Sequence, residues 1–134
     1  MRLFDQCVLE WCKLFGDLKG EHAWPNIVID PAAFEAALLS QLVVSATVFD
    51  DYRINMREYR DKFVAHLDSE RVMNIPNLDT AKASVALYHD HIASQEASPG
   101  DLTGLPESAA RLSEYYQHCA DEAERVYSKI SAEA

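Results

Sequence analysis

The position of its helix-breaking residues constrains this 134-residue chain more than any other feature of its sequence. The four glycines and five prolines fall into clusters at 16–31, at Pro76 and at 99–106. Between these clusters nothing interrupts a helix, and the apolar residues recur at spacings of three and four, which places them on one helical face. We find no convincing alternation with a period of two. The sequence therefore predicts an all-α bundle of four or five helices in a single domain over residues 1–134.

The first two predicted helices are separated by a loop. The apolar stripe of the first helix ends at the glycines of residues 16–20. The segment 21–30 contains an Ile-Val-Ile run, which β propensity favours, but no partner strand is evident, so we expect a packed loop. Asp30 then places a capping side chain before Pro31, a proline at the first helical position. This pair predicts the start of the second helix.

Capping signals also mark the next two helices. Ser45 or Thr47 can cap the third, and Thr47 is followed three residues later by an acid, as in a capping box. The fourth helix should begin at Asn77 or Asp79. In both helices apolar residues recur at spacings of three and four. We therefore expect each of them to bury one face.

The fifth helix follows a long loop over residues 94–104 and is the most regular. From Leu105 its apolar positions keep a heptad alternation to the end of the chain. The sequence does not distinguish packing inside the same domain from pairing with another chain. The positions are Ala109, Leu112, Tyr116, Cys119, Ala123, Val126 and Ile130.

Composition excludes several classes of protein. Twelve basic residues against 22 acidic ones give a formal net charge of −10, which argues against a generic basic nucleic-acid binder. A hydrophobic content of 49% is too high for a chain that is disordered throughout. The longest apolar run, at 36–46, is interrupted by polar residues and falls short of the ~20 residues that a membrane span needs. The acid at Asp5 is unlike a signal peptide, so we expect a cytoplasmic protein without a membrane span.

Three cysteines, Cys7, Cys12 and Cys119, fit neither a disulfide framework nor a zinc-binding pattern. We expect them to be small core residues. The His89-x-His91 pair would point about 160° apart on a helix, and no third ligand has a fixed spacing to it. We therefore expect no metal site.

The third predicted helix carries a basic stripe beside its apolar face. Arg53, Arg57 and Arg60 follow one another at i, i+4 and i+7, and Lys62 adds a fourth positive charge. Local positive charge on an acidic protein predicts an anion-binding surface, with Arg53, Arg57 and Lys62 as phosphate-binding residues. The alternative is a solvated helix face whose charge is neutralised by nearby acids. Those acids are Asp50, Glu58 and Asp61.

The segment 59–68, Tyr-Arg-Asp-Lys-Phe-Val-Ala-His-Leu-Asp, resembles the Arg-x(4–6)-His motif of the HEPN superfamily. An aromatic residue before the arginine, an acid after it and a small residue before the histidine are similar to the abortive-infection, AbiU-like branch. Upstream of the motif, that branch also tends to carry a Cys-Lys-Leu-Phe-Gly-like segment and a tryptophan, matched here by residues 11–16 and by Trp24. The resemblance covers residues 7–95. In the last helix the only shared feature is that the segment is helical.

The resemblance implies a HEPN-like helical fold and a metal-independent endoribonuclease of a toxin–antitoxin or phage-defence system. His66 would transfer the proton of the RNA 2′-hydroxyl. Arg60 would hold the non-bridging phosphate oxygens, and Asp61 would orient one of these groups. The substrate would be RNA, and the reaction would need no cofactor and no metal.

Helical geometry bears on this pair. Six residues correspond to about 600°, so Arg60 and His66 would lie about 120° apart around one regular helix. They converge only if the helix loosens near Ala65 or if a second protomer completes the site. The resemblance favours the second arrangement, a homodimer with the third helix at its two-fold interface. Alternatively, His66 caps the helix end and Arg60 pairs with Asp61 or Glu58.

The sequence also leaves two other functions open. The net charge of −10 favours a non-catalytic HEPN-like interaction module, which would bind a cognate partner protein or RNA without cleaving it. The heptad seam of the last helix favours a scaffold that pairs with another chain.

Overall fold

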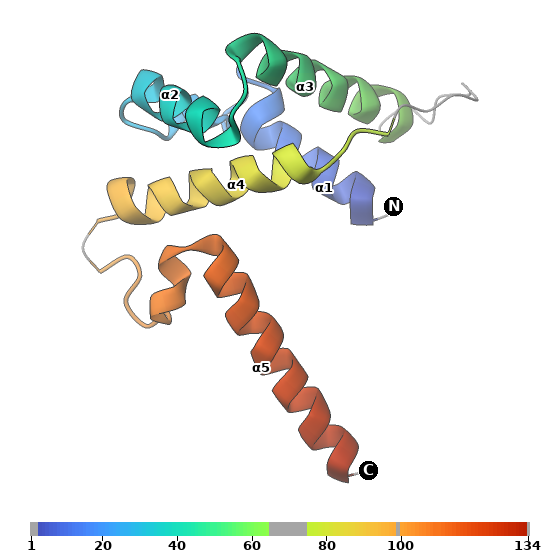
Figure 1. The fold of residues 1–134 in the computed structure, drawn as a ribbon, viewed down its shortest axis with the longest axis vertical. Helices are drawn as coiled ribbons and strands as arrows, with labels where there is room; N and C mark the ends of the chain where they lie inside the picture. Colours follow the sequence, from blue (N-terminus) through green and yellow to red (C-terminus); the bar gives the residue numbers. More distant parts are fainter. Residues whose placement is uncertain (1–2, 65–74, 99, 134) are drawn as a thin grey trace. The chain divides into compact units, whose positions relative to one another are not determined.

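The computed structural model describes residues 3–64, 75–98 and 100–133, apart from the side chains of residues 63 and 64. Its described part contains helices and turns but no strand (Figure 1), so the predicted all-α fold is confirmed. The α-helices are α1 (Leu3–Trp11), α2 (Pro31–Leu42), α3 (Ala46–Tyr59), α4 (Asp79–His91) and α5 (Leu112–Glu133). Wider π-helical turns extend three of them: η1 (Cys12–Gly16) after α1, η3 (Arg60–Val64) after α3 and η4 (Ile92–Glu96) after α4. Two 3₁₀ turns are η2 (Trp24–Asn26) and η5 (Glu107–Ala110).

The chain divides into two compact units, residues 1–85 and residues 86–134. The boundary falls inside α4, so this helix contributes to both. The single domain predicted over 1–134 stays a prediction.

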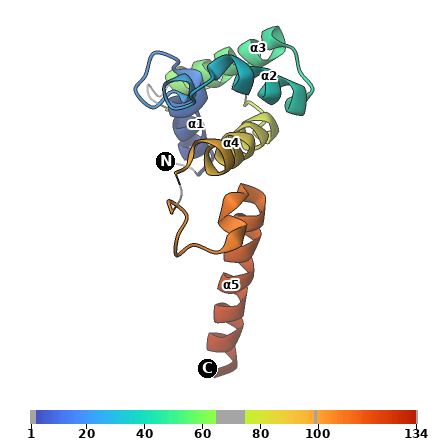
Figure 2. The same ribbon diagram turned by 90° about the vertical axis from the view of Figure 1, so that its left-hand side faces the viewer.

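The core of the first unit is built around Trp11, at the end of α1. Its indole Nε1 donates a hydrogen bond of 2.9 Å to Ser84 Oγ of α4, and both residues are buried. The ring stacks on Phe15 and meets Tyr52 edge to face, each at 5.4 Å between centroids. Figure 2 shows α1, α3 and α4 around this common centre. The apolar faces predicted for these helices therefore meet in one core.

Two tyrosines of α3 tie it to its neighbours. The Tyr52 hydroxyl donates to the Asn77 carbonyl at 2.6 Å and accepts from the Ala81 amide at 3.2 Å, and its burial raises the pKa of Tyr52. The Tyr59 hydroxyl donates to Asp5 Oδ1 at 2.8 Å. Each phenol thus packs its ring inside while its oxygen satisfies a polar group of another segment.

The start of α2 agrees with the sequence, and the start of α3 agrees with one of its two predicted caps. Asp30 Oδ1 accepts from the Ala33 amide at 3.1 Å with Pro31 at the first position, as predicted. Ser45 Oγ accepts from the Val48 amide, so Ser45 caps α3 and the capping box predicted at Thr47 is wrong. The acid expected to complete that box pairs with an arginine instead.

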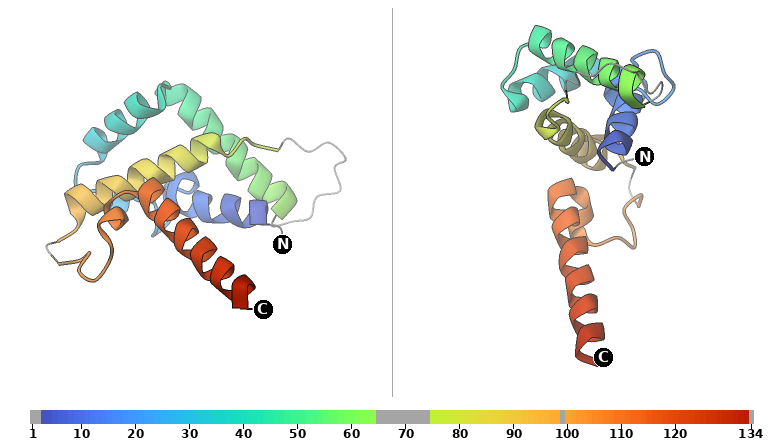
Figure 3. Two further views of the ribbon diagram at one scale, coloured as in Figure 1. Left: turned by 60° about the horizontal axis from the view of Figure 1, so that its bottom comes forward. Right: turned by 90° about the vertical axis from the view of Figure 1, so that its right-hand side faces the viewer.

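A sharp corner joins α2 to α3. The two helices make an angle of 89°, and the left panel of Figure 3 shows the corner plainly. Val43 ends α2 in the left-handed region, with φ 56° and ψ 45°, and is 88% exposed. Left-handed backbone is costly for a β-branched residue. Before α2, residues 21–30 form the packed loop that the sequence predicted, with the η2 turn inside it.

In the second unit the helix boundaries differ from those predicted. The turn η4 extends α4 into the segment predicted as loop, because backbone hydrogen bonding continues to Ala97. The fifth helix begins at Leu112 rather than Leu105, since Arg111 is extended and separates η5 from α5. Asp90 Oδ1 accepts from the Leu112 amide at 2.8 Å and so holds the start of α5.

The solvent exposure of α5 is high along its whole length. Every residue from Tyr116 onward in the described helix is exposed, and only Leu112 and Tyr115 are half-buried. The cysteine prediction is correct for Cys12 alone, because Cys7 and Cys119 are exposed. Among the described residues, no single helix has the length and apolarity to cross a membrane; α2 and the adjoining helix 46–62 would meet these criteria only as a bent pair.

Candidate functional site

The arginine stripe of α3 and η3 meets the segment that ends the first helix. Arg53 Nη1 donates to the carbonyl of Gly16 at 3.0 Å. The Asp17 carboxylate receives the other two arginines, with Arg57 Nε 3.4 Å from Oδ1 and Arg60 Nη1 2.5 Å from Oδ2. Three guanidinium groups therefore converge on two consecutive residues of another helix end.

A glycine permits this approach. A Cβ added at Gly16 would lie 3.0 Å from Cys12 Cβ, 3.1 Å from Cys12 Sγ and 3.3 Å from Arg57 Cγ. Real Cβ atoms rarely come so close to their neighbours. A side chain at position 16 would make these neighbours shift by a few tenths of an ångström, so glycine favours the close contact between η1 and the arginine side of α3.

Arg60 is held by two carboxylates. Its side chain is 18% exposed, and besides Asp17 it contacts Asp61, with Nε 2.8 Å from Oδ1. Burial opposes its charge, but the hydrogen bonds to Asp61 and Asp17 outweigh burial and raise the pKa of Arg60. The guanidinium stays charged and is fixed by two carboxylates.

Arg57 is held less completely. Its Nε is buried and makes no hydrogen bond, because the 3.4 Å approach to Asp17 has the distance of an ion pair but not the geometry of a hydrogen bond. Its side chain is 42% exposed. Arg53, by contrast, makes a two-pronged contact with Asp50, at 3.0 Å and 2.6 Å. Arg57 Nε thus has unused hydrogen-bonding capacity, whereas Arg53 makes three hydrogen bonds, two to Asp50 Oδ1 and one to the Gly16 carbonyl.

A buried thiol lies beneath the arginines. Burial raises the pKa of Cys12 to about 11; Asp17 and Asp61 add to the shift, while Arg60 and Arg57 oppose it. The thiol is therefore protonated at neutral pH and does not serve as a nucleophile.

The residues predicted for the site have different outcomes. Arg60 and Asp61 are in direct contact, as the alternative interpretation of the motif expected. Lys62 is exposed on η3. His66 lies outside the described residues. The sequence did not lead us to predict Asp17 as a site residue. The signal that could have identified it is an acid directly after Gly16, the glycine that ends the first helix.

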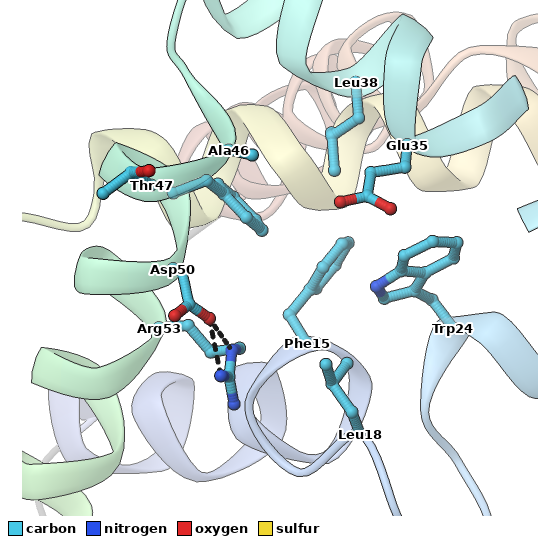
Figure 4. Close-up of a pocket in the computed structure, with 10 residues that line it drawn as sticks. Phe15, Leu18, Trp24, Glu35, Leu38, Ala46, Thr47, Asp50 and Arg53 are labelled. Carbon is cyan, nitrogen blue, oxygen red and sulfur yellow. Dashed lines mark hydrogen bonds and ion pairs between the residues drawn. The ribbon is translucent and has the colours of Figure 1, made fainter. Parts of the chain in front are cut away.

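A pocket of about 380 Å³ lies beside Arg53. Figure 4 shows the carboxylate of Glu35 and the indole nitrogen of Trp24 directed into it, with Phe15 between them. Phe15 is fully buried. The lining residues are Phe15, Leu18, Trp24, Glu35, Leu38, Ala46, Thr47, Phe49, Asp50 and Arg53. The pocket combines aromatic walls with hydrogen-bonding groups at its rim.

The histidines of α4 make separate pairs. His89 Nδ1 lies 3.3 Å from Asp90 Oδ1, and His91 Nε2 lies 2.9 Å from Glu96 Oε1. Within the described part of the chain, no three His, Cys, Asp or Glu side chains gather as a metal site would require.

Comparison of the chain with protein-family models, with curated proteins and with solved structures finds no significant match.

Proposed function

We propose that this chain is a HEPN-like, metal-independent endoribonuclease of a toxin–antitoxin or phage-defence system, in which Arg57 and Arg60 bind the reacting phosphate. One observation carries the proposal: guanidinium groups from successive turns meet on a single carboxylate, one on each oxygen of Asp17. An RNA phosphodiester has the same charge and also presents two non-bridging oxygens. The arginine pair therefore suits a phosphate as well as it suits Asp17.

The position of Asp17 restricts how RNA can bind to the arginines. The carboxylate occupies the position that the phosphate would take, so RNA has to displace it or share the arginines with it. The buried Nε of Arg57 makes no hydrogen bond, so a phosphate oxygen would reach it only once Asp17 has moved aside. In the proposed reaction Arg60 stabilises the charge that develops on the phosphate, and His66, assigned by the motif alone, moves the proton of the 2′-hydroxyl.

The neighbouring pocket supports binding of a nucleotide. A base beside the arginines would stack on its aromatic wall, while Glu35 and Thr47 offer hydrogen bonds to base edges. We further propose a homodimer with α3 at its interface and a cognate partner protein, which follow from the resemblance, and a cytoplasmic location, which follows from the acid at Asp5.

The test is cleavage of single-stranded RNA in EDTA. The wild-type chain should leave 2′,3′-cyclic phosphate ends. His66→Ala should lose at least a hundredfold in rate, and Arg60→Lys, which keeps the charge but not the two-pronged contact, at least tenfold.

Asp17→Asn should instead bind RNA about tenfold more tightly, because the competing carboxylate charge is gone; tenfold corresponds to about 1.4 kcal/mol. Asp51→Asn makes the same charge change on an exposed residue of α3 and should have little effect. Equal cleavage by all variants, or a requirement for metal, would contradict the proposal.

A second candidate function, a non-catalytic interaction module, is favoured by charge balance within the site. Arg53 pairs with Asp50, and Arg57 and Arg60 pair with Asp17 and Asp61, so three positive charges meet three negative ones. A chain of net charge −10 then has little net attraction for RNA. No cleavage, no RNA binding by Asp17→Asn and a stable complex with a neighbouring gene product would establish this alternative.

A further inference from the structure

The helix α5 exposes an apolar seam to water. Tyr116 is 73% exposed and Ile130 is 62% exposed, although both occupy seam positions. Along 22 residues, or about 33 Å of helix, no described residue of α5 is buried. An amphipathic helix of this kind is expected to be covered by another helix.

The charges beside the seam indicate what covers it. In heptad notation Leu112, Cys119 and Val126 take position d, and Tyr116, Ala123 and Ile130 take position a. The flanking e and g positions are Ser113, Tyr115, Ala120, Glu122, Tyr127 and Lys129. Among these six there is one acid and one base, Glu122 and Lys129, seven residues apart and both at g.

We propose that α5 pairs with α5 of a second copy of this chain in an antiparallel orientation. In an antiparallel pair g positions face g positions, so Glu122 lies level with Lys129 of the second copy, and the two-fold axis repeats the contact. In a parallel pair g faces e, and Glu122 would face Tyr127. Only the antiparallel pair places these two opposite charges level with one another; within its own helix Glu122 also lies 3.7 Å from Arg125 Nη2 and 3.6 Å from His118 Nε2.

The sizes of the seam residues favour the same register. When Glu122 is level with Lys129 of the second copy, Ala123 faces Val126 and Cys119 faces Ile130. Each of these layers pairs a small side chain with a larger one, which keeps the helix separation even. A parallel pair would stack Ala123 on Ala123 and Ile130 on Ile130, giving layers of unequal width.

This contact is independent of the proposed nuclease activity and of the α3 interface proposed above. Where both form, α5 pairing joins α3 dimers into larger assemblies, and the Kd values below refer to the α5 step alone. Exposed ion pairs contribute only ~0.2–1 kcal/mol each, so the apolar seam provides most of the stability of the α5 pair. The ion pairs determine the relative orientation of the two helices.

Sedimentation equilibrium of the full chain over a range of concentrations tests the proposal. Glu122→Lys and Lys129→Glu each place like charges opposite one another twice and should raise the dimer Kd at least fivefold. The double exchange E122K/K129E should restore it to within about twofold of the wild-type value. Glu124→Lys makes the same charge change as Glu122→Lys at position b, away from the seam, and should leave Kd nearly unchanged.

Val126→Asp should reduce association at least fiftyfold, because it places a charge in a seam layer. Three results would overturn the proposal. The first is a mass of one chain at every concentration up to about 100 µM. The second is a dimer in which the double exchange fails to rescue the single variants.

The third concerns Cys119, studied in a Cys7→Ser chain so that the other exposed thiol is absent. In the antiparallel register the two copies of Cys119 are about 11 residues, or roughly 16 Å, apart along the helices, beyond the reach of a disulfide. Rapid formation of a Cys119 disulfide on mild oxidation would indicate a parallel pair.

Discussion

The arginine side of α3 and the helix α5 have the same kind of sequence pattern and different surroundings. Both carry apolar residues at spacings of three and four with charged residues beside them. On α3 the apolar face ends in buried residues, with Met56 at 0% and Tyr59 at 5% exposure, and each arginine contacts an acid of the same chain. On α5, Tyr116 and Ile130 are mostly in water. A heptad-like pattern thus shows that a face needs a partner, but not whether the same chain provides it.

Truncating one apolar residue in each region should give the largest difference in the free energy of unfolding between the two regions. Met56 is fully buried, and Met56→Ala should lower the free energy of unfolding by about 2–5 kcal/mol through lost contacts and a cavity. Val126→Ala, on a side chain that is 47% exposed, should change it by no more than ~0.5 kcal/mol in the monomer. Urea denaturation at low protein concentration measures both. Equal losses would mean that α5 is packed on the rest of the chain.

The buried thiol beneath the arginines predicts a pH dependence for the first unit. Burial raises the pKa of Cys12 from 9.0 to about 11. Between these values the folded state keeps a proton that the unfolded state has lost, so stability is fully present below pH 9 and decreases as the pH rises towards 11. The expected loss is about 2–3 kcal/mol, at 1.36 kcal/mol per pH unit.

A Cys12→Ala variant isolates this contribution, because the tyrosines titrate in both proteins. The difference in unfolding free energy between wild type and variant should shrink across this pH range. A difference that stays constant would mean that the thiol does not titrate in this way. Cys119, exposed on α5, should react with iodoacetamide in the native chain while Cys12 does not.

The sequence predicted those features that depend on neighbouring residues. The Asp30–Pro31 helix start and the apolar faces follow from local backbone and side-chain geometry, and both agree with the structure. Local sequence allows either Ser45 or Thr47 as the cap of α3. In the structure Ser45 is the cap, and Asp50, the acid that would complete a capping box with Thr47, contacts Arg53 instead. The start of α5 also differed, since an extended Arg111 leaves no mark in the periodicity.

The candidate site shows the same limit. The alternative interpretation of the motif expected Arg60 to pair with its neighbour Asp61, and that contact is present, whereas the orienting role of Asp61 stays a prediction. Asp17 lies 43 residues from Arg60 in sequence, and only the packing of η1 against α3 brings the two together. Sequence periodicity indicates the face on which the arginines lie, but not which residue of another helix meets that face.

Neutralising Asp17 should have a moderate effect on folding. Asp17→Asn leaves Arg60 with Asp61 alone and removes the only carboxylate near Arg57 among the described residues, so we expect a loss of about 1–3 kcal/mol at neutral pH. Asp121→Asn, the same change on exposed α5, should have almost no effect. Thermal unfolding of both variants at low and high salt measures the difference. Equal stability of the two variants would show that the ion pairs of Asp17 contribute no more to folding stability than exposed surface ion pairs do.

The smallest expected effect comes from placing glycine at one exposed residue of each region. Val43 holds a left-handed backbone conformation that costs an L-residue roughly 1–2 kcal/mol, and it is 88% exposed, so little packing is lost with its side chain. Glycine removes that strain but increases the entropy of the unfolded chain, so Val43→Gly should stabilise the first unit by up to about 1 kcal/mol. Ala123→Gly, inside a regular exposed helix, relieves no strain and should destabilise α5 locally by about 1 kcal/mol. Thermal unfolding reports the first change, and amide hydrogen exchange in α5 reports the second. Destabilisation by Val43→Gly would mean that its side chain makes a contact worth more than the strain of its backbone.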